Sequence, residues 1–254
     1  MIGPADISDA TASSPLGRTS PIVKLVVALG WLIGLAFTTD PRPPVAIAVV
    51  AIASGVVLGR VETTRLIRTI LPLGLAAIGI GVFNVLFSAS NLDQTATELA
   101  RLGPLRIASA AVAGGLGLGL RVLAIASVGA VFSLTTDSTR LVDALAQQAR
   151  VPERFAYGAL AAYQAVPRFG EDLTTLRQAR RVRGLRGSWR PRILVGLLIL
   201  AIRHGDRLAL AMDARAFGSG PRSRYRIVTW RPLDAVVAVG AVIVLVVALR
   251  LPAG

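Results

Sequence analysis

The sequence contains no cysteine, a single histidine (His204) and a single lysine (Lys24). Without cysteine, the chain can form no disulfide, no cysteine-ligated zinc site and no thiol-based catalytic centre. One histidine cannot build a metal site that needs several histidine ligands. The lysine is not preceded by the glycine pattern of a Walker A motif, so the chain does not itself hydrolyse ATP by P-loop chemistry.

Recognisable catalytic sets of side chains are also missing. No Ser/His/Asp or Cys/His set can be assembled convincingly, and the nearest polar group is His204-Gly205-Asp206. A lone histidine beside an aspartate is far more often an interface hydrogen bond than a catalytic pair. We therefore expect no catalytic residue, metal ligand or cofactor-binding residue in the chain, and a role other than that of an enzyme.

What is abundant is apolar and basic. The 254 residues are 54% hydrophobic, and the formal net charge is +14. Such an apolar composition points to a protein that crosses a membrane several times. A basic balance suits nucleic acid, anionic lipid or the cytoplasmic loops of a membrane protein. Because the arginines flank long apolar runs, the third interpretation is favoured, with the lipid bilayer rather than nucleic acid as the partner.

Five apolar stretches predict transmembrane helices, and the second of them is short for a span. They run over residues 21–38, 45–58, 70–87, 107–135 and 234–249. Residues 1–20, rich in Ser, Thr, Ala and Pro, read as a disordered lead-in rather than as a cleaved signal peptide. The fold class expected is therefore all-α: a polytopic membrane protein with about five transmembrane helices and additional cytoplasmic helices.

Three features inside the spans need an interpretation. Asn84 is best read as an interhelical hydrogen bond, although an intramembrane amide can also be functional. The glycine run 114–119 lies within a membrane-length apolar stretch, so it indicates close helix packing rather than a phosphate-binding loop. Arg121 would be costly in contact with lipid, so we expect it near an interface or facing a polar cavity.

The region between residues 136 and 232 differs from the rest. From Asp137 to Arg231 it holds 18 arginines against seven acidic residues. By the positive-inside rule this region is cytoplasmic. Four preceding spans then put the N-terminus inside, the mixed-charge loop 88–106 outside and the C-terminus outside. The predicted organisation is a lead-in (1–20), four spans (21–135), a cytoplasmic helical platform (136–232) and a last span (233–250) in the cell (inner) membrane.

Helix signals divide this platform. Capping residues at 136–139 predict a helix through Arg150, and Pro152 suits the first turn of a helix that Pro167 then breaks or kinks. The next helix contains Glu171 and ends at the glycines 184 and 187. An apolar segment, 191–202, is too short to span, and a final helix over 208–217 is closed by Gly218 and Gly220.

Two arginine motifs, about thirty residues apart, end these last helices. The first is Gln178-Ala179-Arg180-Arg181-Val182-Arg183-Gly184, and the second is Ala211-Met212-Asp213-Ala214-Arg215-Ala216-Phe217-Gly218. Each places a basic residue and then a glycine after a helical run, which is typical of a helix C-terminus. Their order, their spacing and their position between membrane spans resemble the transmembrane (T) component of energy-coupling factor (ECF) transporters, the EcfT/CbiQ family.

Members of that family carry two X-Arg-X motifs, usually Ala-Arg-Gly, at the ends of two cytoplasmic coupling helices. Here Val182-Arg183-Gly184 and Ala214-Arg215-Ala216 stand in those places. The first has valine for alanine, and the second has alanine for glycine, with a glycine two residues later at Gly218. Ala179 before the first motif and Ala211-Met212 before the second fit the family pattern.

The resemblance implies a mechanical role. The two motif helices would dock onto two ABC-type ATPase subunits, which bind the ATP, and would pass ATP-driven motion to a substrate-binding S component. Arginine suits such an interface because its planar guanidinium makes bidentate bonds to carboxylates. The S component would select the substrate, a vitamin or a transition-metal ion.

Two alternatives stay open. A self-contained permease or channel would need ionisable or polar residues along a pathway, for which only Asn84 and Arg121 are candidates. A membrane-anchored basic adaptor would bind nucleic acid or an anionic surface through its arginines.

Overall fold

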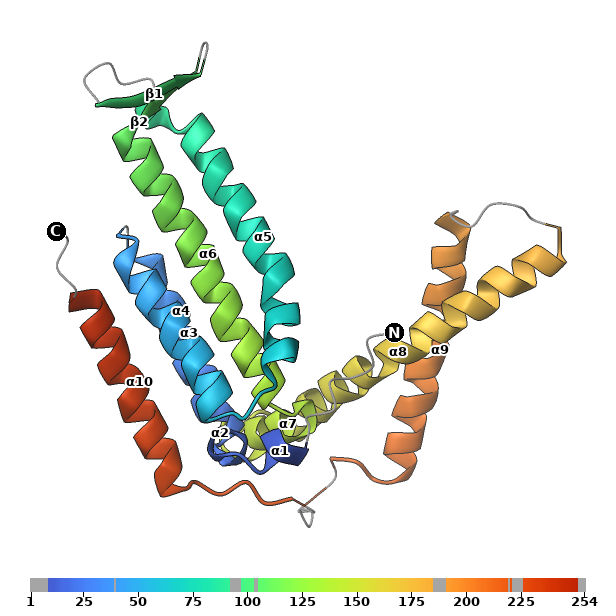
Figure 1. The fold of residues 1–254 in the computed structure, drawn as a ribbon. Helices are drawn as coiled ribbons and strands as arrows, with labels where there is room; N and C mark the ends of the chain where they lie inside the picture. Colours follow the sequence, from blue (N-terminus) through green and yellow to red (C-terminus); the bar gives the residue numbers. More distant parts are fainter. Residues whose placement is uncertain are drawn as a thin grey trace. The chain divides into compact units, whose positions relative to one another are not determined.

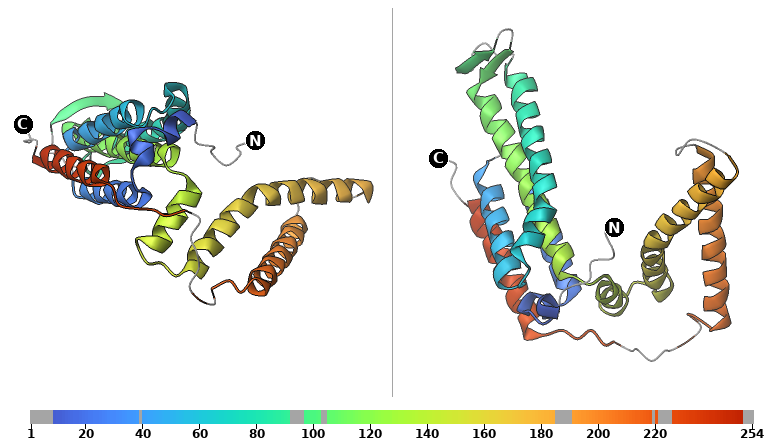
Figure 2. Two further views of the ribbon diagram at one scale, coloured as in Figure 1. Left: turned by 90° about the horizontal axis from the view of Figure 1, so that it is seen from below. Right: turned by 45° about the vertical axis from the view of Figure 1, so that its right-hand side comes forward.

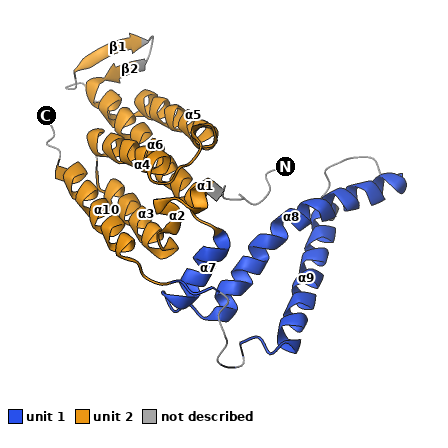
Figure 3. Cartoon of the chain, turned by 60° about the horizontal axis from the view of Figure 1, so that its bottom comes forward, with its two compact units in different colours: residues 1–6, 138–228 blue, residues 7–137, 229–254 orange. Residues whose placement is uncertain are grey.

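The computed structural model describes residues 9–38, 40–91, 97–102, 105–184, 191–218, 220 and 226–250. The chain divides into two compact units (Figure 3), after residues 137 and 228. We call residues 7–137 with 229–254 the bundle unit and residues 138–228 the platform unit. These boundaries lie close to those expected from the sequence, after residues 135 and 232.

Apolar helices make up the bundle unit (Figure 1): α3 (Pro21–Ala36), α4 (Arg42–Val57), α5 (Thr63–Phe87), α6 (Ser109–Thr135) and α10 (Pro232–Arg250). Within the described residues, α5, α6 and α10 are long and apolar enough to cross a membrane, while α3 and α4 are shorter apolar helices. At about 1.5 Å per residue, each of the shorter two extends for roughly 24 Å. The all-α membrane fold expected from the sequence is confirmed.

The bundle is held together by small residues at close contacts. A Cβ on Gly115 of α6 would overlap Val85 of α5 and lie 2.7 Å from the carbonyl oxygen of Gly81. Gly119, one turn further on, faces the carbonyl of Ala77 in the same way. The prediction that the 114–119 run serves close packing is thereby confirmed.

A second set of contacts joins the remaining helices of the bundle. Trp31 and Leu35 of α3, Ile47 of α4 and Ala124 of α6 are buried in one apolar cluster. The indole nitrogen of Trp31 also donates a hydrogen bond of 3.0 Å to the carbonyl of Ala241, which joins α3 to α10.

The structure of the N-terminal segment differs from the one predicted from the sequence. Residues 1–20 were expected to be disordered; residues 1–8 lie outside the described part, but residues 9–20 are ordered. They form α1 (Asp9–Ala12) and α2 (Pro15–Arg18), and Ser14 caps α2 by accepting from the Gly17 amide. Leu16 is buried against the bundle, and its amide donates to the carbonyl of Leu58 at 3.1 Å. Because these contacts involve residues distant in the sequence, the local composition of residues 9–20 could not predict them.

The first turn of α3 connects two other helix ends. Lys24 is buried, and its Nζ donates to the carbonyl of Thr135, the last residue of α6, at 2.6 Å. Asp234, at the start of α10, is also buried; its Oδ1 accepts from the Ser20 amide at 2.7 Å and its Oδ2 from the Arg231 amide at 2.8 Å. Charged side chains therefore satisfy backbone groups that helix termini leave unpaired.

The connection between α5 and α6 is more ordered than the polar loop expected. It contains a 3₁₀ turn, Ala89–Asn91, and an antiparallel hairpin of β1 (Glu98–Leu102) and β2 (Leu105–Ala108). Asn91 donates from Nδ2 to the carbonyl of Val85 at 2.7 Å and accepts from the Ala108 amide at 2.9 Å. One side chain thus fastens the base of the hairpin to the end of α5.

The platform unit consists of α7 (Ser138–Gln147), α8 (Glu153–Val182) and α9 (Pro191–Ala214). Two expectations were wrong here. Pro167 does not break α8, which curves but continues (Figure 2). The segments 191–202 and 208–214 belong to the single helix α9, and residues 215–217 form the turn that follows it. Proline removes one backbone donor, and the neighbouring turns of a thirty-residue helix retain theirs.

Candidate functional site

The first arginine motif is the C-terminal end of α8. The helix ends at Val182, and Arg183 occupies the C-cap position, where its amide donates to the carbonyl of Ala179 at 3.3 Å. Gly184 follows with φ +70°, and its amide donates to the carbonyl of Arg181 at 3.0 Å. A residue with positive φ directly after the C-cap is the usual way to end an α-helix.

The second motif is the C-terminal end of α9 and has the same construction. After Ala214, Ala216 has φ +53° and donates its amide to the carbonyl of Asp213 at 2.9 Å. The Phe217 amide reaches back to the carbonyl of Met212 at 3.0 Å. These two bonds form a Schellman motif, in which Arg215 is the C-cap residue.

Arg183 and Arg215 therefore occupy corresponding C-cap positions, each followed by a residue with positive φ whose amide bonds a carbonyl of the last helical turn. The expectation that both motifs end helices is confirmed, and a cation at each C-terminus is favoured by the helix dipole. Of the residues that frame the motifs, Ala179 and Met212 contribute carbonyls that accept the capping bonds, while Ala211 lies exposed one turn before Arg215.

Both motifs are open to a partner. Val182 is 89% exposed, which is unusual for a valine at the end of a helix that packs on another. Arg183, Gly184, Ala214 and Ala216 are exposed as well, as are Arg215 and Gly218. No contact within the described residues accounts for an apolar side chain at position 182.

The two motifs lie at opposite ends of α8. Phe217 of the second motif contacts Tyr157 near the start of α8, with 6.3 Å between ring centroids, whereas Arg183 follows its last residue. The helical rise between Tyr157 and Arg183 corresponds to roughly 39 Å along α8. The platform unit thus presents two arginine-capped helix ends that are far enough apart for separate protein surfaces.

The second motif is held by contacts with α7 and α8 that the sequence analysis did not predict. The Tyr157 ring meets Phe217 edge-on, at 84° between planes, and its hydroxyl donates to Oδ1 of the buried Asp143 on α7 at 2.8 Å. Gln147 on α7 binds the segment after the motif: its Nε2 donates to the carbonyl of Arg226 and its Oε1 accepts from the Val228 amide. Only the amphipathic pattern of α7 hints at such a packing role.

Positive charge accumulates along the last turns of α8. Arg177, Arg180 and Arg181 precede Arg183, and none of the four lies within ion-pair distance of a carboxylate in the described part of the chain. The Nε atoms of Arg177 and Arg180 are sealed from solvent without a hydrogen-bond partner there. This end of α8 is therefore suited to an acidic partner.

The residues considered for metal binding or for a transport pathway do not form a site among the described residues. Among the described residues no group of three or more His, Cys, Asp or Glu could hold a metal ion. The side chain of Asn84 forms no hydrogen bond with the described part of the chain, and its Oδ1 lies 3.9 Å from where a Cβ of Gly114 would be. The expected interhelical hydrogen bond is therefore not found there. Arg121 is half-buried, and its Nε has no partner among those residues.

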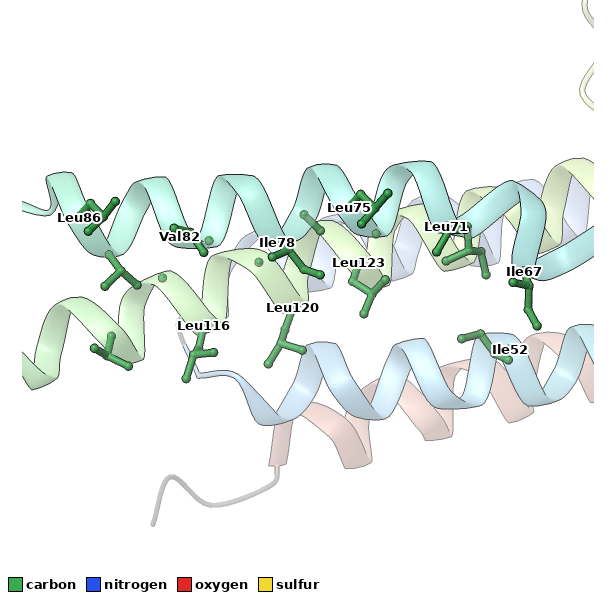
Figure 4. A pocket seen from close by; sticks show the side chains of 18 of the residues that line it. Ile52, Ile67, Leu71, Leu75, Ile78, Val82, Leu86, Leu116, Leu120 and Leu123 are labelled. Atoms are coloured by element: carbon green, nitrogen blue, oxygen red, sulfur yellow. The ribbon is translucent and has the colours of Figure 1, made fainter.

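The bundle unit carries an apolar groove of about 880 Å³ along α5 and α6 (Figure 4). Leu75 and Ile78 of α5 lie beside Leu120 and Leu123 of α6, and Ile67 lies near Ile52 of α4. None of the described residues that line the groove is charged. Such a surface suits lipid tails or the apolar face of another membrane protein.

Comparison with known proteins gives a consistent result. The family model described as cobalt transport protein, CbiQ, matches residues 12–226. The chain is 28% identical to the energy-coupling factor transporter transmembrane protein EcfT of Heliobacterium modesticaldum, with 92% of each chain covered. It is 27% identical to EcfT of Limosilactobacillus fermentum, with 91% of each covered.

One relative is much longer. A Bifidobacterium longum protein named as an ABC transporter ATP-binding protein is 26% identical over 94% of this chain, and the chain spans 32% of that protein's length.

Proposed function

Because the chain belongs to the CbiQ family and is the transmembrane component of an energy-coupling factor transporter, we propose that it couples ATP hydrolysis on two ABC-type ATPase subunits to substrate uptake. In this role the chain is embedded in the cell (inner) membrane, with its N-terminus and residues 136–232 in the cytoplasm. ATP is bound and hydrolysed by the partner subunits, and this chain carries no cofactor.

One observation carries the proposal: Arg183 and Arg215 cap two exposed helix ends with the same backbone geometry, at opposite ends of α8. Each guanidinium can enter a groove on one ATPase subunit and bind carboxylates or carbonyls there. Two such contacts, one at each end of the thirty-residue helix α8, match a pair of similar subunits better than a single one.

The ATPase partnership has further support. The Bifidobacterium relative is itself named as an ATP-binding protein of an ABC transporter, and it contains a region similar to nearly all of this chain. When the ATPase subunits close on ATP, they would displace the two capped helix ends and hence α8 and α9.

The other partner is a substrate-binding S component held against apolar surface. The groove along α5 and α6 offers uncharged side chains to a membrane-embedded helix. The S component selects the substrate, which we assign by class to vitamins or transition-metal ions.

The test is affinity co-purification with the ATPase subunits in mild detergent. The charge reversal Arg183→Glu/Arg215→Glu places two carboxylates at the docking positions, so we expect the ATPase subunits to be lost or ATP-driven uptake to be uncoupled. Each single variant separates the contribution of one motif.

A matched control is Arg168→Glu/Arg203→Glu, which changes the same net charge at exposed positions of the same two helices outside the motifs. This control should co-purify like wild type. If the motif variant retains the ATPase subunits and uptake, or if both double variants lose them equally, the arginines are topology determinants rather than docking residues.

A further inference from the structure

We propose that Tyr157 is a positioning residue that holds the Arg215 motif against α7 and makes the two ATPase contacts mechanically unequal. This inference rests on the proposed docking role of Arg183 and Arg215. It concerns which of the two contacts is rigid, and which residue makes it so.

The first link is between Tyr157 and the motif itself. Phe217 is two residues after Arg215, and its amide closes the capping turn on Met212. Its ring lies edge-on to Tyr157 at a centroid distance of 6.3 Å, a favourable arrangement for two aromatic rings. A fixed Phe217 therefore fixes the turn that carries Arg215.

The second link is between Tyr157 and α7. The Tyr157 hydroxyl donates to Oδ1 of Asp143 at 2.8 Å, and Asp143 is only 7% exposed. A hydrogen bond to a buried carboxylate is stronger than one between neutral groups and restrains the ring orientation. Val142 and Ala146 of α7 pack in the same apolar cluster as Tyr157, so the ring is held on both its polar and its apolar side.

A third contact lies between Gly218, at the end of the second motif, and Arg154 of α8. Gly218 has φ +80°, and a Cβ at this position would overlap Nε of Arg154 and lie 3.1 Å from its Cγ. The Arg154 side chain thus covers the backbone directly after Phe217. Arg154 and Tyr157, one turn apart on α8, therefore both contact the short segment of Phe217 and Gly218.

The first motif has no equivalent support in the described part of the chain. Val182 is 89% exposed, and no described atom lies within 4 Å of the position that a Cβ of Gly184 would take. Within the described residues, the Arg183 end of α8 therefore has no such supporting contacts, whereas the Arg215 end of α9 is held by Tyr157 and Arg154. Because α7 begins three residues after α6 ends, displacement of the braced motif passes through α7 toward a membrane helix.

The first experiment compares Tyr157→Phe with Tyr163→Phe, measuring the affinity of the detergent-solubilised chain for purified ATPase subunits. Both variants remove one hydroxyl from the same helix, but Tyr163 is 53% exposed and its side chain has no hydrogen bond or ring contact among the described residues. We expect Tyr157→Phe to weaken the affinity by about 3- to 10-fold, which corresponds to loss of one hydrogen bond, and Tyr163→Phe to leave it unchanged.

A double-mutant cycle separates positioning from general destabilisation. If Tyr157 acts through the second motif, Tyr157→Phe has no further effect in an Arg215→Ala background and its full effect in an Arg183→Ala background. An equal effect in both backgrounds, or no effect in the wild-type background, overturns the inference.

The same cycle keeps the two proposals distinct. If neither Arg183→Ala nor Arg215→Ala weakens ATPase binding, the docking role itself fails. If Arg215→Ala weakens binding and Tyr157→Phe does not, docking stands and the positioning role of Tyr157 is refuted.

Discussion

Gly184 and Ala216 occupy the same position in the two motifs and share a left-handed backbone, with φ +70° and +53°. Glycine adopts this conformation without steric cost, whereas a Cβ makes it unfavourable by about 1 kcal/mol. The capping bonds of Ala216 and Phe217 hold the alanine in place. The second motif therefore keeps the glycine geometry of the family pattern although its residue is alanine.

Replacing Ala216 with glycine should relieve this strain. We expect Ala216→Gly to raise the free energy of unfolding by about 0.5–1 kcal/mol. Thermal unfolding in detergent, followed by circular dichroism, measures the change. As a control, Ala214→Gly changes the last helical residue of α9 and should destabilise by about 0.5–1 kcal/mol. A destabilising Ala216→Gly would show that residue 216 is not left-handed.

The contact between α5 and α6 should be sensitive to a single methyl group. Gly115→Ala places a Cβ against Val85 and the carbonyl of Gly81, so we expect a loss of about 1–3 kcal/mol. Gly129→Ala on the same helix meets no described atom within 4 Å and should be neutral or slightly stabilising. The thermal midpoints of the two variants give the comparison, and equal midpoints would argue against tight packing at Gly115.

The buried lysine should be important for the stability of the bundle unit. Lys24→Met retains the apolar stem but leaves the carbonyl of Thr135 without its donor, which we expect to cost about 1–3 kcal/mol. Arg18→Met removes a charge from an exposed position in the same region and should cost less than about 0.5 kcal/mol. Chemical unfolding in mild detergent distinguishes the two; similar effects would mean that net charge, not the buried bond, matters.

The hairpin should depend on one amide side chain. Asn91→Ala removes the bonds to the carbonyl of Val85 and the amide of Ala108, so the base of the hairpin should open. Hydrogen exchange measured by mass spectrometry should then be faster for residues 98–102 and 105–108, with exchange in α3 unchanged. Unchanged protection of the hairpin would show that strand pairing alone holds it.

Features that depend on neighbouring residues could be predicted from the sequence. Long apolar runs indicated the membrane helices, and a basic residue followed by a small one indicated where α8 and α9 end. Features that depend on distant residues could not. Leu16 is ordered through Leu58, and Tyr157 contacts Phe217, sixty residues further along the chain.

Predictions from single helix-breaking residues also failed where the residue lies inside a long helix. Pro167 carries a strong helix-breaking preference, but the hydrogen bonds of the surrounding turns maintain α8. The segments 191–202 and 208–217 were expected to be separate, but His204, Gly205 and Asp206 lie within α9 and connect them, because one glycine costs a long helix only about 1 kcal/mol.

The bonds of Lys24 and Asp234 give the architecture a modular character. The chain leaves the bundle unit after Asp137 and returns to it at Thr229. Thr135 and Asp234, which lie close to these two points in the sequence, are both hydrogen-bonded to the start of α3. In topological terms the platform unit is an insertion into a bundle whose ends are already joined without it. Platforms of different length or sequence could therefore be exchanged between family members while the same membrane bundle is retained.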